Sequence, residues 1–204
     1  MTLRFYNFLL HLCIEISDMN NRNFMLVGVC IMVAAIFRLL PHPPNATPIA
    51  AMALMGGLYV SKKHLAFILP LAALLISDII LNNTVLRSFY PEQTGIILFS
   101  NYMIATYAAF IITVIIGLRL IRQSAMNKII LGTLLSSIGF FIITNLGVWM
   151  GSVIYPKSPA GLIACFSAAI PFFKNTLLGN ALFITLFVAS IESIKKYYWS
   201  KSLA

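Results

Sequence analysis

The feature that most constrains this chain is a series of long apolar segments that carry no charge. Residues 96–118 and 129–153 contain no Asp, Glu, Lys or Arg. A helix needs about 20 residues to cross the hydrocarbon core of a bilayer, and both segments exceed that length. Inside such a core the backbone N–H and C=O groups must be paired within the segment. The segments therefore predict membrane-spanning helices.

The composition of the whole chain supports this prediction. Charged residues make up 9% of the 204 residues, hydrophobic residues make up 60%, and the mean hydropathy is +0.94. A soluble domain carries roughly 25% charged residues, so this chain has too few charges to cover a water-soluble globule. We expect an all-α, polytopic membrane protein whose main partner is the lipid bilayer. The net charge of +9 comes from short basic loops and does not indicate a nucleic-acid partner.

The apolar pattern predicts six membrane-spanning helices in one domain over residues 24–194, between an N-terminal tail over 1–23 and a basic tail over 195–204. Residues 160–173 are apolar but short and end near Pro171, so we expect an interfacial or re-entrant segment there. The six predicted spans cover residues 24–40, 47–60, 64–81, 96–118, 129–153 and 175–194.

The basic residues predict how the chain is oriented. Ten of the 14 Lys and Arg residues fall in the tails and the loops on the side of the tails, and four fall on the opposite side. Cytoplasmic loops are enriched in Lys and Arg, so we expect both termini in the cytoplasm and a multi-pass protein of the cell inner membrane. The four residues on the outer side are Arg38, Arg87, Lys157 and Lys174.

The first residues do not look like a spanning segment or a cleavable signal peptide. Residues 1–18 contain a short apolar stretch interrupted by His11, Glu15 and Asp18. We hypothesise that translation begins at Met19 and that residues 1–18 are an upstream extension. The intact mass of the native protein tests this, since a mass matching a start at Met1 excludes it.

Polar side chains of the predicted spans gather in the outer half. A charged side chain at the centre of a bilayer costs about 2.5–3.5 kcal/mol on translocon scales and normally faces protein or water. Polar groups at one level on several helices therefore predict an outward-facing cavity, with the proline-rich segment "PHPPN" at its rim. The candidate substrate-binding residues are Arg38, His42, Asn45, Asp78, Asn145, Trp149, Lys174 and Asn175.

Each of these residues also has a structural interpretation. Asp78 is the acidic residue well inside a span, and it either pairs with Arg38 or Lys174, binds a ligand group or carries a coupling proton. His42 is either a solvated loop residue or a ligand to a metal or a ring. Trp149 is either an anchor at the membrane interface or a stacking surface.

Small residues repeat in "AAMALMGG". Ala53 and Gly57 lie four residues apart, with Ala50 and Gly56 near the same helix face. Small residues at this spacing let helices approach closely. These four residues serve either packing within the protein or packing against the helix of a partner protein.

Nothing in the sequence indicates an enzyme, a metal site or a cofactor. There is no nucleophile elbow, no H-E-x-x-H motif and no phosphate-binding loop. Cys13, Cys30 and Cys165 are scattered and match neither a zinc site nor a disulfide framework.

Longer blocks carry a family resemblance. "RLLPHPPNATPIAAMALMGGLYV", "LPLAALLISDIIL" and "ITNLGVWMGSVIYPKSPAGLIACFSAAIPFFKNTLLGN" resemble a bacterial membrane family, domain of unknown function 6580. That family resembles the substrate-binding S-components of energy-coupling-factor transporters. The resemblance implies uptake of a small-molecule nutrient, cobalamin or another vitamin, with a coupling protein and ATPases as partners. The A-x-x-x-A pattern of S-components is missing here, because Ala34 and Ala35 are adjacent.

Two functions from different classes follow. The first is an S-component-like uptake protein that binds a vitamin or related nutrient in the outer cavity. The second is a membrane scaffold that binds other proteins and has no small-molecule substrate, for which the small-residue face would serve.

Overall fold

We analysed a computed structural model of the chain, which describes residues 21–60, 62–121 and 126–202. Every regular element in these ranges is a helix, and none of the described residues forms a strand. The all-α prediction is therefore confirmed. The hypothesis about residues 1–18 falls outside the described residues.

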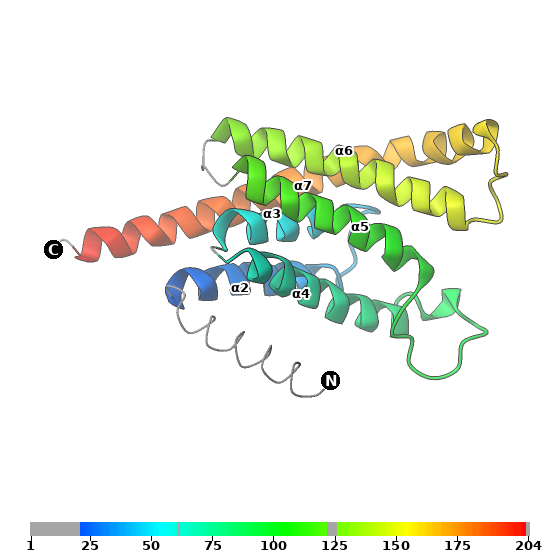
Figure 1. The fold of residues 1–204 in the computed structure, drawn as a ribbon. Coiled ribbons are helices and arrows are strands. Elements are labelled where there is room, and N and C mark those ends of the chain that lie inside the picture. The colour runs from blue at the N-terminus through cyan, green and yellow to red at the C-terminus, as the bar shows by residue number, and fades with distance from the viewer. Residues whose placement is uncertain (1–20, 61, 122–125, 203–204) are drawn as a thin grey trace.

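Four helices are long and apolar enough to cross a membrane (Figure 1). Their spanning portions average 1.8 to 2.2 in hydropathy. They indicate a multi-pass membrane protein. The four are α4 (Lys63–Asn83), α5 (Asn101–Ile116) continued by the π-helical turn η2 (Gly117–Ile121), α6 (Met126–Gly151) and α7 (Pro159–Ser202).

Two apolar helices are shorter, α2 (Asn21–Phe37) and α3 (Ile49–Tyr59). The 11 residues of α3 span about 17 Å at a rise of 1.5 Å per residue, roughly half of a 30 Å hydrocarbon core. The irregular segment 38–48 joins the two helices. A 3₁₀ turn, η1 (Arg87–Phe89), lies in the connection between α4 and α5.

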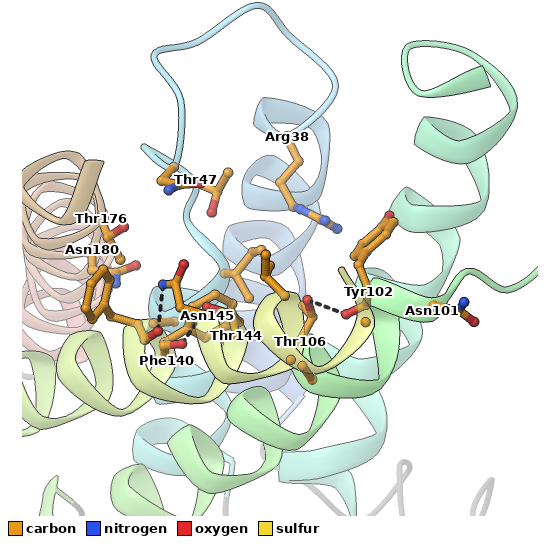
Figure 2. Close-up of a pocket in the computed structure, with 18 of the residues that line it drawn as sticks. Arg38, Thr47, Asn101, Tyr102, Thr106, Phe140, Thr144, Asn145, Thr176 and Asn180 are labelled. Carbon is orange, nitrogen blue, oxygen red and sulfur yellow. Dashed lines mark hydrogen bonds between the residues drawn. The ribbon is translucent and has the colours of Figure 1, made fainter. Parts of the chain in front are cut away.

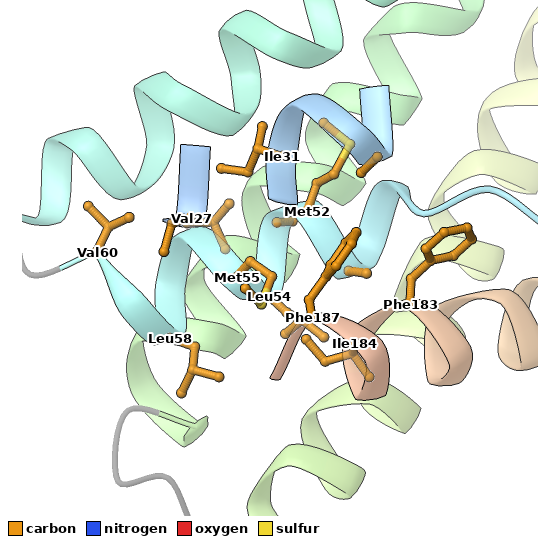
Figure 3. Packing of buried hydrophobic residues seen from close by; sticks show 14 of the residues in the cluster. Val27, Ile31, Met52, Leu54, Met55, Leu58, Val60, Phe183, Ile184 and Phe187 are labelled. Carbon is orange, nitrogen blue, oxygen red and sulfur yellow. The ribbon is translucent and has the colours of Figure 1, made fainter. Parts of the chain in front are cut away.

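Helix α3 lies at the centre of the bundle. All ten residues from Ile49 to Leu58 are buried, and α3 packs against α2, α4, α5, η2 and α7. Its sequence explains this position, because it contains apolar and small residues and no charge. Figure 3 shows Met52, Leu54 and Met55 of α3 between side chains of α2 and aromatic side chains of α7. The core therefore forms around the shortest helix.

The two glycines of α3 sit where neighbouring backbones touch it. A Cβ atom added to Gly57 would lie 2.7 Å from the Cα of Gly117 in η2. A Cβ added to Gly56 would collide with the carbonyl oxygen of Ala66 in α4. Pro70 has no N–H to make the usual helical hydrogen bond to that carbonyl, and Gly56 packs directly against it.

These contacts decide between the two interpretations of the small residues. Ala50, Ala53, Gly56 and Gly57 are all buried within the chain. A surface for a partner's helix at these positions is therefore corrected to packing against this chain's own helices.

The expectation of a separate segment at 160–173 was wrong. Helix α7 is continuous from Pro159 to Ser202, passing through Pro171. A proline removes one backbone donor, but it is tolerated in membrane helices where neighbouring groups compensate. The 44 residues of α7 span about 66 Å, and the helix passes the whole bundle in Figure 1.

The connections fall at two ends of the bundle. The α4–α5 and α6–α7 connections lie at one end, and the C-terminal part of α7 extends from the other (Figure 1). Lys62 and Lys63 at the start of α4, Arg119 in η2 and Lys128 at the start of α6 lie at the end from which α7 extends. We call this the basic end.

Candidate functional site

A cavity of about 560 Å³ lies between α5, α6, α7 and the segment that joins α2 to α3 (Figure 2). Small-molecule sites usually have volumes of about 300–1,000 Å³. Among the described residues its lining combines amides, hydroxyls, aromatic rings and one charged side chain. The lining residues are Arg38, Asn45, Thr47, Ile49, Ala50, Asn101, Tyr102, Ala105, Thr106, Phe140, Phe141, Thr144, Asn145, Gly147, Val148, Gly151, Ser152, Thr176 and Asn180.

The short length of α3 makes room for this cavity. Ile49 and Ala50, at the first turn of α3, belong to its lining, so the space lies beyond the N-terminal end of that helix. The rim residues Asn45, Asn101 and Gly151 are exposed, so the cavity reaches the surface. Asn45 has a φ of 63°, a left-handed conformation that asparagine tolerates better than most residues.

Arg38 is held at the cavity by an ion pair with α4. Its Nη2 lies 2.5 Å from Asp78 Oδ1, and its Nη1 donates to the hydroxyl of Ser77. The side chains of Arg38 and Asp78 are 5% and 0% exposed. Breaking such a buried pair by removing one partner typically costs about 3–5 kcal/mol. Two polar atoms of the pair, Arg38 Nε and Asp78 Oδ2, have no hydrogen-bond partner in the described structure.

Two threonines of the lining bond back to their own helices. Thr106 Oγ1 donates to the Tyr102 carbonyl over 3.0 Å in α5, and Thr144 Oγ1 donates to the Phe140 carbonyl over 2.7 Å in α6 (Figure 2). A hydroxyl has one hydrogen to donate. Each threonine oxygen therefore remains as an acceptor.

Hydrogen bonds fix the orientation of two amides in the lining. Asn145 Nδ2 donates to the Phe141 carbonyl over 2.7 Å, and a carbonyl can only accept. Asn180 Nδ2 donates to Ser137 Oγ over 3.0 Å. Ser137 already gives its proton to the Thr133 carbonyl, so its oxygen must accept from the amide. Asn180 Oδ1 is buried and has no partner in the described structure.

Comparison with known proteins places the chain in a family. A family model with the description "Family of unknown function (DUF6580)" matches residues 18–202. The chain belongs to this family. No curated protein and no solved structure matches it.

The structure brings three of the eight predicted binding residues together at the cavity. Arg38, Asn45 and Asn145 belong to its lining. Asp78 lies behind Arg38 and is fully buried, in the pairing that the sequence offered as one alternative. Asp78 therefore acts on the cavity through Arg38.

The other four predicted residues lie outside the lining and have their own contacts. His42 Nδ1 donates to the Leu40 carbonyl over 2.6 Å, and its ring lies 5.7 Å from that of Phe37. Trp149 Nε1 donates to the Pro156 carbonyl over 3.0 Å.

Lys174 is exposed on α7. Asn175 Nδ2 donates to the Pro44 carbonyl over 3.0 Å and so ties the segment 38–48 to α7. Asn175 and His42 therefore hold the segment 38–48 in place and do not line the cavity. The sequence-based prediction included residues around this segment that lie outside the lining.

Sequence reasoning missed several lining residues. Thr106, Thr144, Thr176 and Asn180 were not among the candidates, although all four line the cavity. One signal was present, since Thr176 and Asn180 are four residues apart in an apolar helix and therefore share a face. Isolated threonines in α5 and α6 give no such signal, because they can bond to their own backbone at any position.

Among the described residues no group of three or more His, Cys, Asp or Glu could hold a metal ion. The two described cysteines, Cys30 and Cys165, are free thiols. The chemistry available at the cavity is therefore hydrogen bonding, aromatic packing and the charge of Arg38.

Proposed function

We propose that this protein binds a small nutrient molecule in the cavity and takes part in its uptake across the membrane. The observation that carries the proposal is the polar lining of the cavity, which includes two residues with a buried, unpartnered polar atom, Asn180 with its Oδ1 and Arg38 with its Nε. A buried polar atom without a partner costs about 1–3 kcal/mol. A bound ligand that pairs with these atoms would recover that cost.

The position of the polar groups gives further support. They lie on helices that are otherwise apolar, where polar side chains are costly and are normally kept for a function. The volume of about 560 Å³ suits a molecule of ordinary metabolite size. It favours a vitamin or precursor smaller than cobalamin, whose corrin ring and nucleotide loop would need a larger space.

The proposal includes an orientation. All six apolar helices would cross the membrane or enter it, both termini would be cytoplasmic, and the protein would lie in the cell inner membrane. The basic end carries Lys62, Lys63, Arg119 and Lys128, which favours a cytoplasmic position. The cavity rim would then face outward.

Cysteine labelling tests this orientation. In a variant without the native cysteines, Val153→Cys, at a fully exposed residue of the α6–α7 connection, should react with an impermeant thiol reagent on intact cells. Asn127→Cys at the start of α6 should react only after the cells are opened. The reverse pattern would overturn the outward-facing cavity.

The S-component-like mechanism is part of the proposal, with a coupling protein and ATPases as partners. Ala34 and Ala35 of α2 are 0% and 8% exposed, so any coupling surface must use other residues. The scaffold alternative has lost its main support, because the small-residue face of α3 is buried.

A thermal-shift screen of the purified protein tests the binding proposal. A ligand at one hundred times its Kd stabilises the folded form by about 2.7 kcal/mol. We expect a vitamin or precursor to raise the melting temperature, with a smaller shift in Asn180→Leu. Thr113→Val is the control, since Thr113 is buried in α5 but outside the lining. A broad panel without any shift would contradict the proposal.

A further inference from the structure

The hydrogen-bonding groups of the cavity define the chemistry of its ligand, an inference that rests on the proposed function. Four polar side chains of α5, α6 and α7, which we call the acceptor wall, each donate one hydrogen bond to a protein oxygen. They are Thr106, Thr144, Asn145 and Asn180. These bonds use the single donor of each hydroxyl and one of the two N–H groups of each amide. What the four side chains mainly offer to a ligand is oxygen: two hydroxyl oxygens and two amide oxygens.

The buried Asn180 Oδ1 makes this preference strong. It is unpartnered in the described structure, on a residue that is 2% exposed and belongs to the cavity lining. An acceptor in this position needs an N–H or O–H group opposite it. Another oxygen acceptor, such as a carboxylate, would leave Asn180 unpaired and would be repelled.

Arg38 offers the ligand a hydrogen-bond donor, in contrast to the acceptor wall. It is the one formally charged residue among the described lining residues. Its Nε has no partner in the described structure and can donate to a carbonyl oxygen. Figure 2 shows Arg38 on a different element from Thr144 and Asn145, so donor and acceptor groups come from different walls.

The charge of Arg38 is already balanced. Asp78 lies 2.5 Å from its guanidinium and is fully buried. An anionic ligand could pair with Arg38 only by weakening the pair and leaving Asp78 uncompensated, which is costly in a buried site. A cationic ligand would find no carboxylate to pair with among the described lining residues, because Asp78 is already paired with Arg38. Both charge classes are therefore disfavoured.

We infer that the cavity selects an uncharged molecule with a planar unsaturated body, N–H or O–H donors that face the acceptor wall, and a carbonyl oxygen that faces Arg38. The rings of Tyr102, Phe140 and Phe141 supply apolar surface for the planar body. Carboxamides, cyclic ureides and nucleosides have this chemistry. Carboxylates, amines and fully N-methylated analogues lack it.

Matched sets of probe compounds test the inference by thermal shift and equilibrium dialysis. Each set contains a neutral carboxamide, cyclic ureide or nucleoside, its N-methylated analogue, its carboxylate analogue and its amine analogue. We expect the neutral donor-bearing member to bind at least about ten-fold more tightly than its analogues, since one or two hydrogen bonds are lost in each.

The outcomes separate the two proposals. Tighter binding of a carboxylate, an amine or a fully methylated analogue would overturn the inference about ligand chemistry and leave the binding function intact. A complete absence of binding in every set would overturn both.

A matched pair of threonine variants provides a test on the protein side. Thr106→Val removes an oxygen of the acceptor wall, and Thr113→Val removes an equally back-bonded hydroxyl of α5 outside the lining. We expect Thr106→Val to raise the Kd of the best probe about three- to ten-fold, the worth of one hydrogen bond. Thr113→Val should leave it unchanged. Equal effects of the two substitutions would contradict a contact at Thr106.

Discussion

The centre of the bundle is filled in one half and hollow in the other, because the central helix α3 is short. At the basic end, α3 fills the centre and every residue from Ile49 to Leu58 is buried. Beyond the N-terminus of α3 the centre holds a cavity of about 560 Å³ with polar walls. One half is closed by backbone contact, and the other is left open between side chains.

The difference indicates that the α3 half mainly contributes folding stability and the cavity half mainly contributes binding specificity. In the α3 half, glycines let backbones touch, and buried apolar side chains pack together in one cluster. In the cavity half, buried polar atoms lack partners in the described structure. We therefore expect substitutions in the α3 half to change folding stability and most substitutions in the cavity half to change binding.

The ion pair between Arg38, which directly follows α2, and Asp78 of α4 is the exception to this division, and it carries the largest expected effect. Arg38→Met should lower the free energy of unfolding by about 3–5 kcal/mol, because it leaves Asp78 buried and unpaired. Thermal unfolding in detergent measures this loss. The double variant Arg38→Met with Asp78→Leu should recover much of it. A double variant as unstable as the single one would show that the pair contributes more than charge balance.

The contact between α3 and η2 gives the next largest effect. Gly57→Ala places a methyl group 2.7 Å from the Gly117 backbone and should cost about 1–3 kcal/mol of stability. Gly28→Ala in α2 is the control, because nothing lies within 4 Å of the added Cβ. That variant should gain up to about 1 kcal/mol from helix propensity. Similar melting temperatures for the two variants would contradict the conclusion that close backbone packing in the α3 half supports stability.

The tie between α7 and the segment 38–48 should have a moderate effect. Asn175→Ala removes its hydrogen bond to the Pro44 carbonyl and should cost about 0.5–1.5 kcal/mol. Ser190→Ala, whose hydroxyl bonds only to the carbonyl of Leu186 in its own helix, should change little. Chemical unfolding of both variants measures the difference.

The smallest stability effect is expected inside the cavity. Asn180→Leu loses the hydrogen bond to Ser137 but also removes the unpartnered Oδ1, so that the two changes nearly cancel. Its melting temperature without ligand should lie close to that of the unchanged protein, while ligand binding is weakened. A loss above about 2 kcal/mol would show that Asn180 is structural.

Much of the fold could be predicted from the sequence, because the signals were local. Apolar length predicted the long helices α4, α5 and α6. The restriction on buried charges offered a pair of Asp78 with Arg38 or Lys174 as one of three alternatives, and the structure shows the pair with Arg38. The continuity of α7 through Pro171 could not be predicted in this way. Whether a proline ends a membrane helix depends on its neighbours in space.

The candidate site was predicted less completely, for a physical reason. Sequence reasoning placed polar residues at one depth but could not tell which way each side chain points around its helix. Asn145 faces the cavity, whereas Trp149, four residues later, bonds to the α6–α7 connection. Thr106 and Thr144 became recognisable only when α5 and α6 were placed together with α7.

The central position of α3 has a consequence for how the protein is made. An 11-residue segment is too short to leave the translocon as a spanning helix on its own, and its burial depends on α7, which is synthesised after α4, α5 and α6. We expect α3 to stay near the translocon until α7 emerges. A chain truncated before α7 would then leave an unfinished centre that quality-control proteases can recognise, so assembly of this protein would be checked when α7 is added.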